Sequence, residues 1–364
     1  MMTPGTLLLH DNLNPDGQNL LFRAPRAVLV AHTAAEARAA LTRIAKAGRD
    51  GLWAAGYLAY ELGHIFEERL EALLPARSKT PLLWFGLYQA PERLGADQVW
   101  RLLAEAPDGR AISVNPVSGF ADYEKPFEQV KALIAAGDSY QVNLTFKARF
   151  MLEGHALGLY RRLAQSQQTA YGAYLDAGDH QVLSRSPELF VALVADELSA
   201  RPMKGTLRRG PTLAQDAAGR AALAADEKNR AENLMIVDLL RNDLGRIART
   251  GSVAVTDLFT VETYRSLHTM TSGIKAQIRP GVGFVEVLEN LFPCGSITGA
   301  PKLRAMEIIH ALEASPRGLY TGSIGYLAPN GDFAFNVAIR TAVIDSEGRG
   351  EIGIGGGIVA DSLA

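Results

Sequence analysis

The stretch Arg201-Pro202-Met203-Lys204-Gly205-Thr206 ends a series of short apolar segments and places one lysine beside a glycine turn. Because Pro202 has no backbone N–H to donate and Gly205 is typical of tight turns, we expect the last strand of the series to end here. The segments before it predict an antiparallel meander with strands at 171–175, 182–186, 189–194 and 198–202. Lys204 would then follow the last strand, in a turn where an exposed lysine is the ordinary expectation.

A glutamate lies upstream of this lysine, in Ser186-Pro187-Glu188. Pro187 restricts the backbone that leads into Glu188, and the meander would bring Glu188 and Lys204 onto one sheet surface. An isolated glutamate would normally be exposed. A lysine, a carboxylic acid and a metal-binding carboxylate are, however, the groups that displace a poor leaving group from a small anion.

The rest of the chain mixes strand and helix patterns. Apolar runs predict strands at 6–9, 27–30, 81–88 and 140–150, and a strand or short helix at 51–62. Helical spacing covers 34–47, a segment that starts at Tyr123, the long segment 221–246, and a segment that opens at 296–302 and runs through Leu312. A soft boundary near 115–119 divides an N-terminal α+β region, 1–117, from a second region, 118–364. We therefore expect an α+β protein.

The strand at 140–150 has an unusual polar face. Alternation places Gln141, Asn143 and Thr145 on one side and Val142, Leu144 and Phe146 on the other. Exposure to solvent explains such a face as well as a binding site does.

Composition excludes several classes of function. The 364 residues include 37 basic and 39 acidic side chains, so no strong field for nucleic acid or a membrane surface is present. One cysteine, Cys294, cannot form an internal disulfide. The sequence has no signal-peptide pattern and no apolar run long enough to cross a bilayer, so we expect a cytoplasmic protein.

Five ordered motifs resemble the chorismate-utilising enzymes. They are the 140–145 strand, Ser186-Pro187-Glu188, Pro202-Met203-Lys204-Gly205-Thr206, the 231–243 helix and Gly299-Ala300-Pro301-Lys302. The match covers about 120–364, and the first hundred residues match only loosely. The resemblance implies antiparallel sheets packed as a sandwich around the active site, with helices outside.

The lysine in Pro-x-Lys-Gly-Thr resembles the mark of the aminodeoxychorismate synthases, whereas anthranilate and isochorismate synthases usually carry alanine there. This implies a transferase of the transaminase class that converts chorismate and ammonia to 4-amino-4-deoxychorismate, for p-aminobenzoate and folate biosynthesis. The alternatives are anthranilate synthase component I and a non-catalytic chorismate-binding subunit. Gln141 argues against attack by water, because isochorismate and salicylate synthases carry a water-activating lysine there and glutamine has no basic nitrogen.

The resemblance also implies catalytic roles. Lys204 would add to C2 of chorismate while Glu188 protonates the departing C4 hydroxyl, and ammonia would then attack C4 and expel the lysine. Glu188 must be neutral near pH 7 for this role, and the Lys204 amine must also be neutral. In the competing mechanism ammonia displaces the hydroxyl directly and Lys204 acts only through its charge.

Further contacts with substrate follow from the resemblance. His268 is implied as a neighbour of the substrate ring, although a buried core histidine is the plainer interpretation. Tyr320, and Arg340 in a strand at 335–344, resemble contacts to the enolpyruvyl carboxylate, for which an arginine fork is well suited. The other predicted substrate contacts are backbone or hydroxyl groups: Gly205, Thr206, Gly355, Gly357, and Ser296 at a helix entrance, where ordinary capping explains the residues equally well.

Glu232 is the expected ligand for Mg²⁺. It lies one helical turn beyond Asn229, and Mg²⁺ prefers few protein carboxylates together with waters and substrate oxygens. An exposed helix glutamate is the alternative. Relatives often carry an acidic residue in place of Asn229, and the family usually continues beyond the equivalent of Ala364 into a helix with a second metal glutamate and a carboxylate-binding lysine. We therefore expect weakened metal and carboxylate binding.

Ammonia is expected from a separate glutamine amidotransferase subunit, because the chain has one cysteine and no Gly-x-Cys-x-Gly elbow. The sequence leaves open the oligomeric state, a fusion to a downstream lyase, and tryptophan binding in the N-terminal half.

Overall fold

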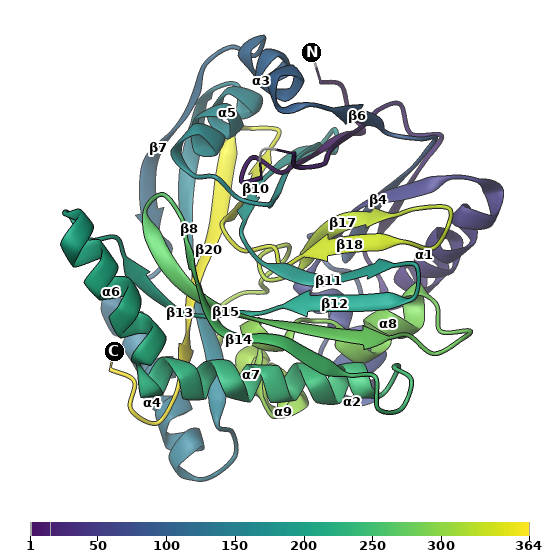
Figure 1. Ribbon diagram of the computed structural model, residues 1–364. Coiled ribbons are helices and arrows are strands. Elements are labelled where there is room, and N and C mark those ends of the chain that lie inside the picture. The colour runs from purple at the N-terminus through teal and green to yellow at the C-terminus, as the bar shows by residue number, and fades with distance from the viewer. Residues whose placement is uncertain (1, 15, 364) are drawn as a thin grey trace.

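The computed structural model describes residues 2–14 and 16–363, and these build two large antiparallel sheets with helices outside them (Figure 1). The first sheet has the strand order β16 (Gly299–Ala300), β8 (Gln141–Gly154), β20 (Arg349–Ile358), β19 (Thr341–Asp345), β10 (His180–Ser186), β9 (Tyr171–Asp176), β1 (Thr6–His10), β2 (Asn19–Phe22) and β6 (Glu92–Leu94), and β7 (Gly109–Pro116) also pairs with β8. The predicted α+β sandwich is confirmed.

The second sheet contains the lysine strand at one end. Its order is β13 (Met203–Arg208), β15 (Leu267–Gln277), β12 (Glu197–Arg201), β11 (Leu189–Val194), β18 (Phe333–Asn336), β17 (Ser323–Leu327), β4 (Trp53–Leu58), β5 (Leu83–Tyr88) and β3 (Ala27–Ala31), and β14 (Ala254–Thr263) pairs with β15. Strands from both sides of residue 117 share each sheet, and the division of the chain at that residue stays a prediction.

Helices cover the outer faces of both sheets. Figure 1 shows α3 and α5 beside the first sheet, and α1, α7 and α8 beside the second. The α-helices are α1 (Ala34–Ala47), α2 (Glu68–Glu71), α3 (Ala96–Ala104), α4 (Phe120–Ala135), α5 (Ala156–Ser166), α6 (Leu213–Ala225), α7 (Glu227–Gly245), α8 (Phe284–Leu291) and α9 (Lys302–Leu312). Short 3₁₀ helices are η1 (Gly48–Asp50), η2 (Tyr60–Phe66) and η3 (Gly295–Ile297). Among the described residues, no helix is both long and apolar enough to cross a membrane.

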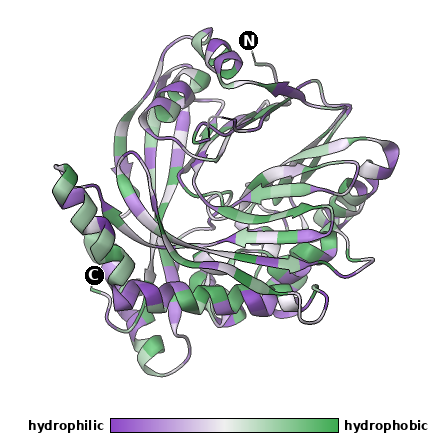
Figure 2. Cartoon of the chain, in the orientation of Figure 1, coloured by the Kyte–Doolittle hydropathy of each residue, from purple (hydrophilic) through white to green (hydrophobic). Residues whose placement is uncertain are grey.

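The apolar core is divided by the sheets. One cluster contains residues from β1 and β2 of the first sheet and from β4 and β5 of the second, among them Leu7, Phe22, Tyr57 and Trp84. Larger clusters lie between each sheet and its helices. Along α7, at the bottom of the view, hydrophobic and hydrophilic bands alternate because one side packs on the second sheet (Figure 2).

Several local predictions are confirmed. The helix at 34–47 coincides with α1, whose first turn is closed by a capping box between Thr33 and Glu36. Strands occur at all of the predicted apolar runs, and the segment 51–62 contains both β4 and the start of η2.

The predicted meander at 171–202 is wrong as a single sheet. β9 pairs with β10 in the first sheet, and β11 pairs with β12 in the second, so the chain changes sheets between Ser186 and Leu189. Local alternation predicts each strand but carries no information about which sheet it joins. Pro187, which has no N–H to donate, lies at the crossing.

Two other long elements are also divided. The predicted strand at 335–344 is β18 of the second sheet followed by β19 of the first, with Arg340 between them at φ 51°. The predicted helix at 221–246 is the end of α6 followed by α7, because Asp226 adopts an extended conformation and its side chain caps α7 by accepting from Asn229 N at 2.7 Å.

Candidate functional site

The two crossings between the sheets lie side by side and bring Glu188 and Arg340 into one region. Val337 N donates to the Glu188 carbonyl at 3.0 Å, and Arg185 N donates to the Arg340 carbonyl at 3.0 Å. Ser186 Oγ also donates to the Val337 carbonyl at 2.6 Å. These bonds take the place of regular ladder bonds where the segment between β10 and β11 and the segment between β18 and β19 each cross from one sheet to the other.

Glu188 is almost completely buried, at 2% exposure. Its Oε1 accepts from Ser296 Oγ at 2.7 Å and from Met203 N at 3.3 Å. Burial raises the pKa of Glu188 to about 7, against the hydrogen bonds from Ser296 and Met203 and the charges of Lys204 and Arg340. A large fraction of this carboxyl is therefore the neutral acid at neutral pH, as a proton donor requires.

Lys204 lies in a bulge of the end strand β13 and not in the turn that the sequence predicts. Met203 pairs with Thr271 and Thr206 with Thr269, so three steps along β13 match two along β15. Gly205 makes the bulge possible because its φ is +84° and a Cβ there would lie 2.8 Å from Asn229 Oδ1. The bulge aims a half-buried lysine toward the first sheet.

The Lys204 amine meets the first sheet at Gly357 of β20. A Cβ on Gly357 would lie 2.9 Å from Lys204 Nζ and 3.0 Å from Gln141 Nε2. Burial lowers the pKa of Lys204, against the negative charges of Glu232 and Glu188. The site is therefore built where the two sheets meet, and the glycine leaves room for the amine.

The polar face of β8 is buried, so solvent exposure does not explain it. Gln141, Asn143 and Thr145 are 0%, 7% and 9% exposed. The amide oxygen and nitrogen of Gln141 have no hydrogen-bond partner among the described residues. Unpaired buried amide atoms are costly, and they suit a ligand that pairs with them.

Glu232 lies on α7 and faces the same region. It is half-buried, and burial raises its pKa against the charges of Lys204 and Lys228. Within the described residues, no group of three or more His, Cys, Asp or Glu side chains is placed to hold a metal. One available carboxylate fits Mg²⁺ that retains waters and substrate oxygens, and it does not fit a cage made by protein alone.

His268 is held by its neighbours. It is 1% exposed, and its ring nitrogens lie 3.0 Å from Thr263 Oγ1 and 3.0 Å from Asp216 Oδ1. The backbone of Leu207, in the lysine strand, pairs with it. The structure therefore links His268 to β13 and α6 and leaves both ring nitrogens occupied.

Ser296 belongs to η3 and not to the start of α9, which begins at Lys302, so its helix-entrance role is wrong. Its hydroxyl bonds to Glu188 instead.

Arg340 is half-buried, burial lowers its pKa, and its Nη1 has no partner among the described residues. The ring of Tyr320 packs over Gly353 of β20, and burial raises the pKa of Tyr320 to about 12. Gly355, also on β20, pairs with Thr145 of β8. Thr206 is exposed.

Two residues that sequence reasoning missed support the site. Arg317, fully buried with Glu313, donates to the carbonyls of Asn143 and Ile297 and so ties β8 to η3. The Cys294 Sγ atom lies 3.2 Å from Ser296 Oγ. A buried arginine carries no sequence pattern, and a single cysteine without a disulfide partner or a Gly-x-Cys-x-Gly elbow gives no signal of a contact with Ser296.

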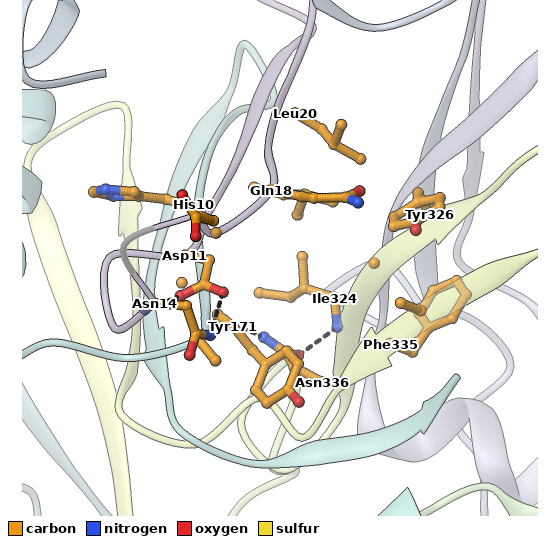
Figure 3. A pocket seen from close by; sticks show the side chains of 17 residues that line it. His10, Asp11, Asn14, Gln18, Leu20, Tyr171, Ile324, Tyr326, Phe335 and Asn336 are labelled. Carbon is orange, nitrogen blue, oxygen red and sulfur yellow. Dashed lines mark hydrogen bonds between the residues drawn. The ribbon is translucent and has the colours of Figure 1, made fainter. Parts of the chain in front are cut away.

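A cavity of about 570 Å³ lies elsewhere, where β1 and the loop after it face β17 and β18 (Figure 3). Figure 3 shows His10, Gln18 and Leu20 on one side and Ile324, Tyr326 and Phe335 on the other. Asn336 closes its base, accepting from Ile324 N at 2.8 Å and donating to the Tyr171 carbonyl at 2.9 Å. None of the predicted site residues lines it.

Comparisons with known proteins show which sequences and folds this chain resembles. A family model described as chorismate binding enzyme matches residues 14–364. Aminodeoxychorismate synthase component 1 of Bacillus subtilis (strain 168) is 38% identical over 273 residues, 73% of this chain and 58% of the relative. The Escherichia coli (strain K12) protein of the same name is 43% identical over 240 residues, 66% of this chain and 53% of the relative.

Other relatives carry other names. Anthranilate synthase component 1 of Pseudomonas putida is 40% identical over 242 residues, 66% of this chain and 49% of the relative. This chain thus spans about half the length of the curated relatives it matches. The crystal structure of anthranilate synthase component I from Streptococcus pneumoniae TIGR4 superposes with a TM-score of 0.81 at 25% identity, covering 97% of this chain and 89% of that one.

Proposed function

The chain belongs to the chorismate-binding enzyme family, and we propose that it aminates chorismate at C4 to give 4-amino-4-deoxychorismate. The observation that carries the proposal is the meeting of Lys204 with Gly357, beside a buried Glu188 whose pKa is raised to about 7. Relatives named aminodeoxychorismate synthase component 1 support it. The product would serve p-aminobenzoate and folate biosynthesis, and the reaction class is that of a transaminase.

The first step is an allylic displacement at the substrate ring. The neutral Lys204 amine forms a bond to C2, both ring double bonds shift by one position, and the C4–O bond breaks as Glu188 gives its proton to the departing hydroxyl, which leaves as water. Burial favours the required form of both groups, because it disfavours the carboxylate and the ammonium alike.

The second step reverses the first with a new nucleophile. Ammonia forms a bond to C4, both double bonds shift back, and the C2–N bond to Lys204 breaks, which releases the lysine as a neutral amine. The Glu188 carboxylate then accepts the proton that the new amine loses, so the enzyme returns to its starting state. The competing mechanism is direct displacement by ammonia, with Lys204 acting only through its charge.

Gln141 explains why ammonia and not water is the nucleophile. Its amide is buried beside Lys204 Nζ and has no nitrogen basic enough to remove a proton from water. Its unpaired oxygen can instead accept from ammonia or a substrate hydroxyl. Anthranilate synthesis is the second choice, because the lysine at position 204 serves no purpose in it.

Mg²⁺ is the proposed cofactor, with Glu232 as the protein carboxylate that would hold it. When bound, it would neutralise a substrate carboxylate. Glu232 itself places a negative charge near Lys204. Arg340 Nη1, which has no partner among the described residues, is available to an anionic group of the substrate. Tyr320, Gly205, Thr206, Gly355 and Gly357 are other proposed substrate contacts. His268 and Ser296 would contact substrate only by packing, because the ring nitrogens of His268 and the hydroxyl proton of Ser296 are paired within the protein.

Ammonia would come from a partner glutamine amidotransferase subunit. The relatives' name, component 1, supports a partner. Burial raises the pKa of Cys294, the single cysteine of the sequence, to about 12, which makes it unsuited as a glutaminase nucleophile.

The test is product analysis by mass spectrometry after incubation with chorismate, Mg²⁺ and ammonium. We expect 4-amino-4-deoxychorismate from the parent and a large loss from Lys204→Ala. Lys275→Ala is the control, because that lysine is exposed on β15 and pairs with Glu197. Anthranilate or isochorismate from the parent would contradict the proposal, and chorismate binding without any product would select a non-catalytic subunit.

A further inference from the structure

Three buried side chains form a line that ends at the carboxyl of Glu188. Cys294 Sγ lies 3.2 Å from Ser296 Oγ, and Ser296 Oγ lies 2.7 Å from Glu188 Oε1. All three residues are less than 5% exposed, at 3%, 4% and 2%. Bulk water therefore does not compete for these groups, and their hydrogen-bond directions are set by one another.

The direction of the bond between Ser296 and Glu188 is determined by chemistry. A serine hydroxyl has one proton to donate and two lone pairs. Glu188 Oε1 also accepts from Met203 N at 3.3 Å, so this oxygen acts as an acceptor of two bonds. Ser296 therefore uses its only proton on Oε1, and any further bond at its oxygen must be one that it accepts.

Cys294 supplies that bond. Burial raises the pKa of the Cys294 thiol to about 12, so the sulfur carries its proton. Ser296 is the only side-chain partner of this sulfur among the described residues. We propose that Cys294 is a positioning residue for the general acid: its S–H donates to Ser296, which holds the serine proton on Oε1 and leaves Oε2 of Glu188 to carry the transferable proton. The inference rests on the proposed function of Glu188.

The charged groups around Glu188 make this orientation matter. Lys204 approaches from β13 and Arg340 from the crossing between β18 and β19, and both favour the carboxylate, while burial favours the acid. The Ser296 hydrogen bond also lowers the pKa of Glu188. Without Cys294 the serine hydroxyl can rotate away, which raises the pKa of Glu188 and lets either oxygen carry the proton.

The experiment compares Cys294→Ala, which removes the donor, with Cys294→Ser, which restores an O–H donor at the same place. The measured quantity is kcat at saturating chorismate from pH 6 to 9, with total ammonium adjusted so that free ammonia stays constant. For Cys294→Ala we expect kcat to fall about fivefold, the effect of one hydrogen bond. We also expect its loss of activity at high pH to move to higher pH, with the KM for chorismate unchanged. Cys294→Ser should recover both quantities.

Two kinetic results would overturn the inference. One is a Cys294→Ala enzyme with the parent's kcat and pH profile. The other is equal loss in both variants, which would mean that the sulfur only fills space. A direct readout keeps the test independent of turnover: the ¹³C chemical shift of the Glu188 carboxyl, assigned with Glu188→Gln, should show a higher pKa in Cys294→Ala and the parent value in Cys294→Ser. An unchanged shift would also reject the inference, whereas a parent that makes no product would reject the proposed function alone.

Discussion

The Ser296 hydroxyl donates to the carboxyl of Glu188 at 2.7 Å across a separation of 108 residues in the chain. This bond joins a 3₁₀ turn before α9 to the point where the chain leaves the first sheet for the second. The acid is thus held by a part of the protein that no local pattern connects to it.

The first prediction concerns pH and activity. Because burial raises the pKa of Glu188 to about 7 and the proposed role needs the acid form, activity should fall as pH rises through about 7. Glu188→Gln should lower kcat by about 100-fold or more, and it should abolish this fall in the residual activity. Glu197→Gln, at an exposed pair with Lys275, is the control. A parent profile without a decline above pH 7 would contradict the assignment.

The second prediction concerns pH and stability. The pKa of Glu188 in the folded protein is about 7, above its ordinary value of 4.5. Its contribution to stability is therefore fully present below pH 4.5 and is lost as pH rises through 7. Between pH 5 and 8 the free energy of unfolding of the parent should drop by about 2 to 3 kcal/mol more than that of Glu188→Gln. Urea unfolding at both pH values measures this difference, and equal changes in the two proteins would refute it.

The third prediction concerns the room that Gly357 leaves for Lys204. Gly357→Ala would place a methyl 2.9 Å from Lys204 Nζ and should displace the amine, with a loss of about 100-fold in kcat. Gly356→Ala is a matched control, because a Cβ at that neighbouring position meets nothing within 4 Å. Steady-state kinetics of both variants, with circular dichroism to confirm folding, decide the matter. Equal activities would show that Lys204 does not depend on this contact.

The fourth prediction concerns the bulge in β13. Gly205→Ala should destabilise the protein by about 1 to 3 kcal/mol, because an alanine is strained at φ +84° and its methyl would lie 2.8 Å from Asn229 Oδ1. Gly245→Ala, at the end of α7 with open space around it, should change stability little. Denaturant midpoints measure both effects. Adding Asn229→Ala to Gly205→Ala should recover the part due to the close contact and not the part due to φ.

The fifth prediction concerns Mg²⁺. Glu232→Gln should raise the Mg²⁺ concentration for half-maximal activity by about tenfold or more, since it removes the one carboxylate proposed as a ligand. Asp238→Asn, an exposed residue on the same helix, should leave it unchanged. Calorimetric titration with Mg²⁺ in the presence of chorismate provides a readout apart from turnover. An unchanged affinity in Glu232→Gln would place the ion elsewhere.

Local elements could be predicted from the sequence, whereas the chemistry proposed for the site rests on the resemblance of its motifs to a known family. The helix predicted at 34–47 coincides with α1 because its apolar spacing is a local property, and the structure adds the Thr33 cap, which is also local. The alternation of β8 showed which of its side chains share a face, although not that this face is buried. The motif around Lys204 indicated an amine nucleophile, and Cys294 was passed over because its partner, Ser296, is itself defined only by a distant contact.

By itself the sequence determined the strands and most of the helices, because side-chain periodicity and glycine turns act over a few residues. Its motifs indicated the candidate site residues only through their resemblance to a known family. Only the tertiary structure decided that β10 and β11 belong to different sheets, that Lys204 sits in a bulge, and that Gln141 is buried beside it. The physical reason is that a strand's pattern fixes which face it buries but not which partner it pairs with. That choice depends on contacts between residues far apart in the chain, and the acid, the amine and the serine meet only through those contacts.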